Sequence, residues 1–128
     1  MVKLKTEFFS VATKPVSAPK GMFDPVKRGN VKADGTEQTL LEYEDVGRVI
    51  GYIDLSEMDV GDSIILRQYM RLVKKGAYKK YAQQTFSAFQ DPPLLYVTPK
   101  ETDLGIKFTL EQTAGEFRRF IYNFMEET

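Results

Sequence analysis

The chain has no cysteine, no histidine and no tryptophan. Without cysteine and histidine it has no thiol nucleophile, no Ser-His or Cys-His pair, and none of the usual ligand sets for zinc, copper or iron–sulfur clusters. The lack of cysteine also leaves the redox compartment undetermined, because disulfides are neither present nor conspicuously avoided. These absences exclude most familiar catalytic mechanisms, so we expect a protein that is not an enzyme and that binds no cofactor or metal ion.

Long apolar runs are missing as well. The first seven residues are too charged, and too soon followed by prolines, to resemble a signal peptide, and no segment is long and apolar enough for a membrane helix. We therefore expect a soluble protein made in the cytoplasm, with no membrane partner. A chain of 128 residues fits one domain with a core of its own.

Charge is distributed unevenly along the chain. The formal net charge is zero, but residues 1–32 hold seven Lys and Arg against two acidic residues, which leaves +5 there and −5 in the remainder. This asymmetry favours a basic segment that lies on an acidic surface, either of a neighbouring copy or of another protein. A basic tail in solvent is the alternative, but such tails are poor in Phe and Val.

The first thirty residues have bulky apolar side chains without the period of a helix or a strand. Pro15, Pro19 and Pro25 disfavour helix at the preceding residues, so the segment is expected to be an extended arm over residues 1–30. We expect the arm to bind partners through apolar anchors and flanking cations: Phe8, Phe9, Val11, Lys14, Val16, Lys20, Met22, Phe23, Lys27 and Arg28.

From residue 31 the pattern changes to two-residue alternation, which is typical of half-buried strands. Turn residues such as Asp34-Gly35, Gly61-Asp62 and Ala114-Gly115 separate the alternating runs. We expect strands at 38–43, 48–55, 63–73, 78–87, 94–98, 104–112 and 120–124, with Met58 placed in the core by a connecting turn. The side chains expected to face inward include Ile64, Leu66, Met70, Leu72, Ile106, Phe108, Leu110, Phe120, Tyr122 and Phe124.

Seven or eight short strands in about a hundred residues indicate an all-β fold. We expect an antiparallel two-sheet sandwich, jelly-roll-like, over residues 31–128. The strand order stays open, because Greek-key and meander topologies share this pattern.

Two acidic groups are weak candidates for sites. Asp54, Glu57, Asp59 and Asp62 surround a turn, but their spacing lacks the alternating oxygen ligands of an EF-hand loop, so a plain turn fits better. A pair of carboxylates would be the hydrolytic mechanism compatible with the missing histidine and cysteine. No spacing marks such a pair among Glu42, Glu44, Asp45 and Glu111.

Basic and aromatic residues are interleaved at 74–81, as in some nucleic-acid patches. In a hairpin they divide between two faces, so we expect a charged hairpin tip that protects a sheet edge, and no nucleic-acid partner. Exposed tyrosines on a sheet face would suit a sugar-binding module, and five are available: Tyr52, Tyr69, Tyr78, Tyr81 and Tyr96. Tryptophan, the usual stacking platform, is missing.

The segments 51–67, 78–81, 93–97 and 110–115 resemble a pattern in small β proteins encoded by prokaryotic viruses. The resemblance covers residues 31–126 and not the arm. It implies a virion component, such as a capsid decoration (cementing) or minor capsid protein, with no catalytic residues to transfer.

Our first hypothesis is therefore a non-enzymatic virion structural protein that forms homo-oligomers through its arm, with a trimeric ring as one candidate, and binds a capsid or other lattice protein. The second is a soluble β-sandwich that binds carbohydrate or another ligand. A third possibility for the arm is that it folds back as an extra strand of its own domain.

Overall fold

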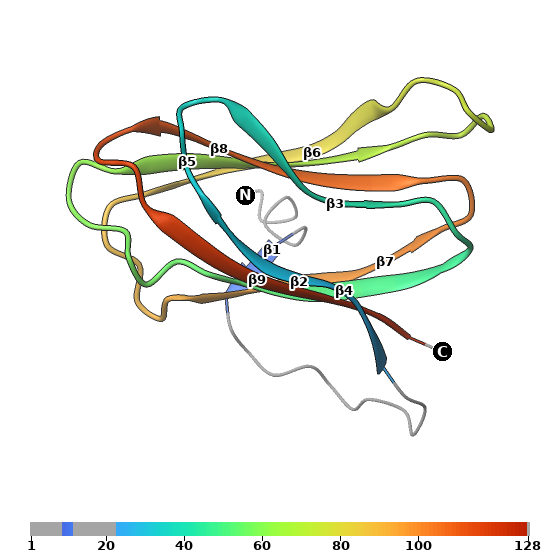
Figure 1. The fold of residues 1–128 in the computed structure, drawn as a ribbon, viewed down its shortest axis with the longest axis horizontal. Helices are drawn as coiled ribbons and strands as arrows, with labels where there is room; N and C mark the ends of the chain where they lie inside the picture. The colour runs from blue at the N-terminus through green and yellow to red at the C-terminus, as the bar shows by residue number, and fades with distance from the viewer. Residues whose placement is uncertain (1–8, 12–22, 128) are drawn as a thin grey trace, which may run out of the picture.

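The computed structural model describes residues 9–11 and 23–127, and all regular structure in these ranges is strand. Two sheets stack face to face (Figure 1). The five-stranded sheet has the order β1-β7-β4-β9-β2 and the four-stranded sheet the order β3-β8-β5-β6. Every recorded neighbour pair is antiparallel. The predicted all-β, two-sheet sandwich is confirmed.

The strand bounds agree with the alternating runs of the sequence. They are β1 (Phe9–Val11), β2 (Phe23–Lys32), β3 (Glu37–Tyr43), β4 (Gly47–Asp54), β5 (Ser63–Met70), β6 (Lys79–Ser87), β7 (Leu94–Thr102), β8 (Ile106–Ala114) and β9 (Arg119–Glu127). All seven strands predicted after residue 31 are present, with β7 and β9 longer than expected.

The connectivity is that of a jelly roll. Among the strands after β1, β2 pairs with β9, β3 with β8, β4 with β7 and β5 with β6. The chain is therefore wound as one long hairpin, and successive strand pairs of this hairpin alternate between the two sheets. This is the double-sheet arrangement of a jelly roll. β1 adds a fifth strand next to β7.

The start of the sandwich lies earlier than the sequence indicated. Residues 23–30, which we expected in the arm, form most of β2 and pair with β9 from Phe23 to Lys32. The two-residue pattern is hidden there because Pro25 is followed by a bulge between Pro25 and Lys27, and because Gly29 takes the place of an inward side chain against Tyr122.

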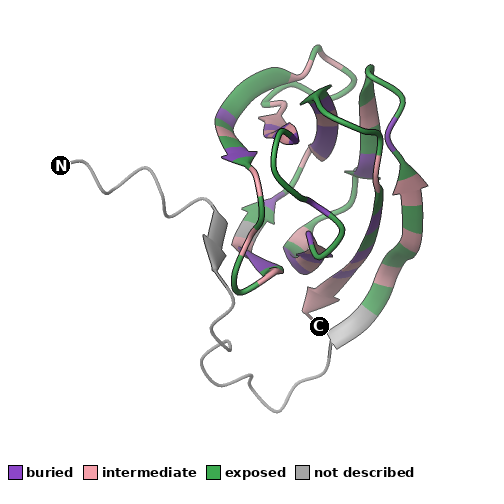
Figure 2. Ribbon diagram, turned by 90° about the vertical axis from the view of Figure 1, so that its left-hand side faces the viewer, coloured by how far each residue is buried: buried purple, intermediate pink, exposed green. Residues whose placement is uncertain are grey.

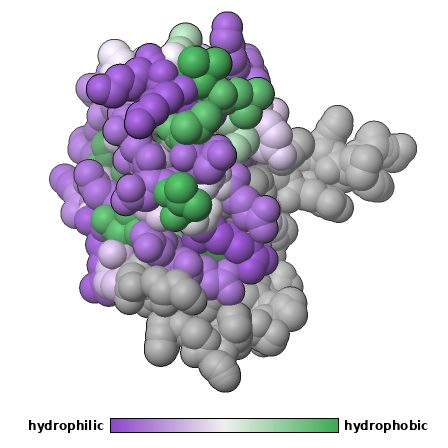
Figure 3. All heavy atoms as spheres, turned by 90° about the vertical axis from the view of Figure 1, so that its right-hand side faces the viewer, coloured by the Kyte–Doolittle hydropathy of each residue, from purple (hydrophilic) through white to green (hydrophobic). Residues whose placement is uncertain are grey.

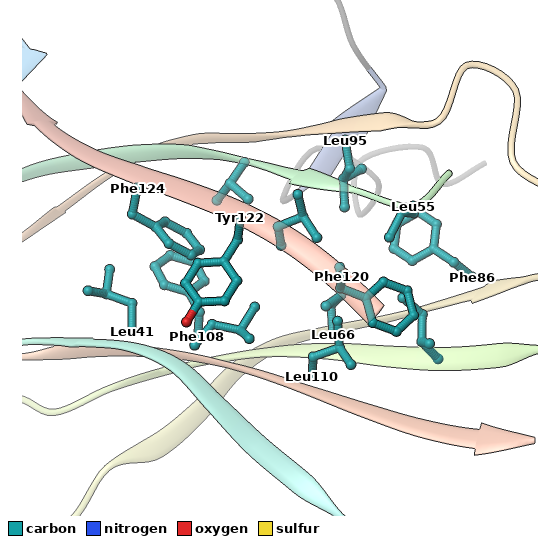
Figure 4. Packing of buried hydrophobic residues seen from close by; sticks show 14 of the residues in the cluster. Leu41, Leu55, Leu66, Phe86, Leu95, Phe108, Leu110, Phe120, Tyr122 and Phe124 are labelled. Atoms are coloured by element: carbon teal, nitrogen blue, oxygen red, sulfur yellow. The ribbon is translucent and has the colours of Figure 1, made fainter. Parts of the chain in front are cut away.

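The core fills the space between the sheets. Buried residues line the inner faces of the strands (Figure 2), and they alternate with more exposed ones in β5 and β9. Phe108 of β8 and Phe124 of β9 stack across the two sheets with ring centroids 5.0 Å apart (Figure 4). The inward positions predicted in β8 and β9 are confirmed, as are Ile64, Leu66 and Met58.

One inward prediction was wrong. β5 ends at Met70, and Leu72 is 82% exposed in the β5–β6 hairpin. The alternation continues in the sequence, but the backbone N–H of Arg71 already bonds to the carbonyl of Gly105, after which the chain turns away. Gln68 occupies the inward position that the apolar pattern skipped, and it is fully buried.

Candidate interaction surface

The outer face of the four-stranded sheet is a network of polar side chains. Glu37 of β3 accepts hydrogen bonds from the Tyr69 hydroxyl and, at 2.6 Å, from the Thr109 hydroxyl. Arg67 of β5 lies 3.3 Å from Glu37 and 2.8 Å from Glu111 of β8. Burial alone would raise the pKa of Glu37, but these hydrogen bonds and the nearby cations outweigh it and lower that pKa. This face therefore satisfies its own polar groups and suits contact with water.

The outer face of the five-stranded sheet is different. Val49, Gly51 and Ile53 of β4 point toward the core side, so the residues between them point outward. We call the resulting surface the outer apolar face. It consists of Ile50, Tyr52, Leu94, Tyr96, Ile121 and Met125.

Two members of the outer apolar face are buried. Ile50 is only 4% exposed and Tyr96 only 8%, yet neither belongs to the core between the sheets. Tyr96 lies against Tyr52 with ring centroids 5.2 Å apart. Burial raises the pKa of both tyrosines. The exposed members of the outer apolar face are Leu94 and Ile121, at 40% and 55%.

The edge of the same sheet is occupied by the earliest described part of the chain. β1 pairs with β7 in the register Phe9 to Val97, Ser10 to Tyr96 and Val11 to Leu95. An uncovered edge strand offers unpaired N–H and C=O groups to any passing strand. The N-terminal segment thus supplies a strand for the β7 edge, as the fold-back alternative predicted.

The predicted partner-binding residues have separate positions. Phe9 and Val11 are in β1, and Phe23 begins β2. Lys27 and Arg28 are exposed in β2, at the opposite edge of the sheet. Phe8, Lys14, Val16, Lys20 and Met22 lie outside the described residues. Nothing in the residue pattern indicated that β7 is the strand with which Phe9–Val11 pair, because β7 looks like an ordinary strand.

A cleft of about 510 Å³ opens at one end of the sandwich, among the β3–β4, β5–β6 and β7–β8 loops. Arg71 organises it: its guanidinium is 3.1 Å from Glu44, donates to the Leu104 carbonyl at 2.7 Å, and lies 4.9 Å from the centre of the Tyr78 ring. The other charged residues of the lining have both signs, namely Asp45, Lys74, Lys75 and Asp103. Figure 3 shows this end as a mosaic of hydrophilic and hydrophobic side chains. The charges of the cleft are balanced against one another, so nothing in it favours one class of ligand.

The acidic turn is structural. Asp62 is buried, and its carboxylate accepts bonds from the N–H groups of Asp59 and Glu116 and, at 2.7 Å, from the Arg118 guanidinium. Burial by itself raises the pKa of Asp62, but these donors outweigh it and the net shift is downward. Both carboxylate oxygens thus connect the β4–β5 turn to the β8–β9 turn. This agrees with the interpretation of the acidic segment as a plain turn. Nothing in the residue pattern indicated Arg118 as the partner.

The tyrosines do not form one platform. Lys107 lies over the rings of Tyr69 and Tyr78, at 4.9 and 5.0 Å, and Arg71 also covers Tyr78. Tyr96 is buried, whereas Tyr81 is exposed on β6 in the other sheet. The Tyr rings therefore offer no shared exposed surface for a sugar ring.

The candidate carboxylates and cations each interact with a neighbouring side chain. Glu111 pairs with Arg67, Glu44 pairs with Arg71, and Lys80 donates to Gln83. This arrangement resembles a solvated strand surface more than a catalytic pair or a phosphate-binding strip. The described part of the chain contains no helix with the length and apolar character needed to cross a membrane.

No protein-family model, no curated protein and no solved structure matches the sequence. The resemblance to small virion proteins therefore stays a hypothesis.

Proposed function

We propose that the protein is a non-enzymatic structural protein that assembles through its N-terminal arm, as a decoration or minor capsid protein of a virus particle would. The jelly roll is an architecture that viral capsid proteins use, although lectins use it as well and a fold does not assign a function. The proposal therefore depends on the arm and on the surface that the arm meets.

The observation that supports it is the pairing of β1 with the β7 edge. A strand of three residues contributes only a few ladder hydrogen bonds, each with a net value of about 1 kcal/mol. Residues 12–22 separate it from β2, so the same strand can reach the β7 edge of a neighbouring copy without any change in the sandwich. Exchange of an identical element between copies is a low-cost route to an oligomer.

The two outer faces also suit such a role. The polar network around Glu37 and Arg67 can face solvent, while the outer apolar face and the β7 edge, where β1 pairs, belong to the other sheet. A decoration protein needs this division, because one side binds the lattice and the other meets water.

Light scattering on the full chain and on a chain that begins at Phe23 tests the proposal. We expect the full chain to have the mass of a defined oligomer and the shortened chain to be a folded monomer. Equal masses for the two folded chains would contradict assembly through the arm.

The ligand-binding alternative receives less support, because its five tyrosines are buried, capped by cations or on different sheets. Glycan binding that is lost on replacing Tyr81 would favour that alternative.

A further inference from the structure

Three large apolar side chains are exposed at the end of the sandwich opposite the β5–β6 hairpin. Val60 is 82% exposed in the β4–β5 loop, Phe89 is 64% exposed in the β6–β7 loop, and Phe117 is 47% exposed in the β8–β9 loop. The three loops lie together at the left-hand end in Figure 1, and Figure 2 looks onto that end. We call the surface formed by these three side chains the loop patch.

One buried residue, Asp62, holds the three loops together. Each residue of the loop patch directly follows a residue whose backbone N–H bonds to Asp62. These donors are Asp59 at 2.8 Å, Ala88 at 2.8 Å and Glu116 at 3.0 Å. The Cα atom of each patch residue therefore lies within about 8 Å of an Asp62 oxygen atom. Segments far apart in the chain thus form one surface.

Local contacts fix the loops in this arrangement. Ala88 has φ +65°, in the left-handed region that L residues rarely adopt, and its bond to the Asp62 carbonyl holds it there. Phe117 lies over the β2–β3 turn, where a Cβ on Gly35 would be 3.3 Å from the ring. The patch is therefore organised before any partner binds, which lowers the conformational entropy lost on binding.

The charged residues around the loop patch are mostly acidic. Loops 55–62, 88–93 and 115–118 contain five acidic residues and one basic residue. Asp62 and Arg118 form a pair at 2.7 Å, which leaves four carboxylates and a charge of −4. All four are exposed, namely Glu57, Asp59, Asp91 and Glu116. An apolar centre with a polar rim is the arrangement of a protein-binding surface, and this rim is complementary to cations.

We propose that the loop patch binds a different protein, through a segment in which apolar side chains alternate with lysine or arginine. The apolar side chains of the partner contact Val60, Phe89 and Phe117, and its cations pair with the acidic rim. Two copies of this chain are poorly suited to pair symmetrically here, because their carboxylates would face one another. The inference does not depend on assembly through the arm, which uses the β7 edge.

Fluorescence anisotropy with two labelled synthetic peptides tests this proposal on the full chain. In one peptide lysine alternates with leucine and phenylalanine, and in the other glutamate replaces every lysine. We expect the lysine peptide to bind, with an affinity that falls as salt is added, and the glutamate peptide to bind at least about tenfold more weakly. No binding of the lysine peptide, or equal binding of both peptides, would overturn the proposal.

Substitutions locate the binding surface. Phe89→Ser with Phe117→Ser removes apolar contacts of the loop patch, and we expect about tenfold weaker binding of the lysine peptide. The matched control is Leu72→Ser with Val73→Ser, because these side chains are 82% and 67% exposed in the hairpin at the opposite end. The control should change the affinity less than about twofold. Equal effects of the two pairs would overturn the assignment to the loop patch.

A second pair of substitutions tests the acidic rim without altering the apolar residues. Asp91→Asn with Glu116→Gln should weaken binding of the lysine peptide and make it less dependent on salt. Glu42→Gln with Glu101→Gln removes the same charge from exposed strand positions and should have a smaller effect. The same loss in both pairs would show that only the net charge matters and would overturn the proposal.

Light scattering identifies the kind of partner. The chain with Phe89→Ser and Phe117→Ser should have the same mass as the native chain, because the loop patch contacts a different protein. A lower mass would assign the patch to a contact between copies and overturn the proposal. A monomeric native chain that binds the lysine peptide would contradict assembly through the arm and still support this inference.

Discussion

At the scale of single residues, the tie between Asp62 and the β8–β9 turn constrains the backbone beside it. Gly115 has φ +91°, and a Cβ there would lie 2.0 Å from the Asp62 Oδ1 atom. Gly61 also has φ +91°, but nothing lies within 4 Å of its Cβ position. The two glycines therefore share the same backbone requirement and differ in the space around them.

Alanine at these two positions should separate strain from steric clash. We expect Gly61→Ala to lower the free energy of unfolding by about 1 kcal/mol, because φ is positive. Gly115→Ala should cost about 3 kcal/mol more, because it displaces a buried carboxylate from its donors. Urea denaturation of both variants measures the difference, and equal losses would show that the contact with Asp62 is unimportant.

Tyr43 predicts a response to alkaline pH. Burial and the 2.9 Å hydrogen bond to Glu126 raise the pKa of Tyr43 to about 12. A group whose pKa is higher in the folded state stabilises that state fully below its unfolded pKa of about 10, and this contribution disappears as the pH rises to 12. The loss should be roughly 2 to 3 kcal/mol.

In the Tyr43→Phe variant, the free energy of unfolding should therefore fall less steeply between pH 10 and 12. At neutral pH the variant should be less stable by about 1 kcal/mol, because it lacks the hydrogen bond. Phe89→Leu, at an exposed ring that carries no ionisable group, is the control and should leave the slope unchanged. The other buried tyrosines have pKa values raised in the same direction, so both variants keep part of the slope. Identical slopes for Tyr43→Phe and the native chain would disprove this assignment.

At the scale of elements, strand positions follow from the sequence, whereas the limits of the sandwich do not. The alternation of apolar residues in β8 and β9 specifies both strands and their inward faces, because one buried face demands a two-residue period. β2 lacks that signal, since its partner β9 supplies the large side chains and Gly29 leaves room for Tyr122. Where the inward positions of a strand hold small residues or a bulge, the strand can be recognised only once the neighbouring strand is known.

Two shortened chains should therefore behave differently. A chain that begins at Phe23 retains β2, and we expect a cooperative fold with an unfolding free energy lowered by roughly 1 to 3 kcal/mol, because the few ladder hydrogen bonds between β1 and β7 are lost. A chain that begins at Val31 loses most of β2 and the packing of Val26 on the core, so we expect it to be unfolded or at least about 3 kcal/mol less stable than the first. Urea denaturation followed by circular dichroism compares them. Equal stability would show that β2 contributes nothing to the fold.

At the scale of the whole molecule, the two outer faces divide the surface into a polar side and an apolar side. On one sheet, Glu37 accepts hydrogen bonds from two hydroxyl groups and pairs with Arg67. On the other sheet, Ile50 and Tyr96 are buried. In the proposed assembly, the sheet with the outer apolar face would meet the partner and the polar network would meet solvent.

Replacing Phe8 and Phe9 together by Ala tests the arm as an anchor of the assembly. If both rings are buried at the contact between copies, association should weaken by about 3 kcal/mol or more. Sedimentation over a range of concentrations measures this. The matched control replaces two exposed phenylalanines elsewhere, Phe89 and Phe117, by Ala and should leave association unchanged. Equal effects of the two pairs would contradict a specific role for the arm.

The all-β class, the seven strands after residue 31 and most inward residues could be predicted from the amino-acid sequence. These features depend on local periodicity and turn residues, which each segment carries in its own composition. Three features became visible only in the folded chain: the jelly-roll pairing of β2 with β9 through β5 with β6, the ion pair between Asp62 and Arg118, and the burial of Ile50 and Tyr96 on an outer face. Each of these features depends on contacts between residues far apart in the chain. A two-residue period shows that a strand has two different faces, but it does not show which residues pack against either face.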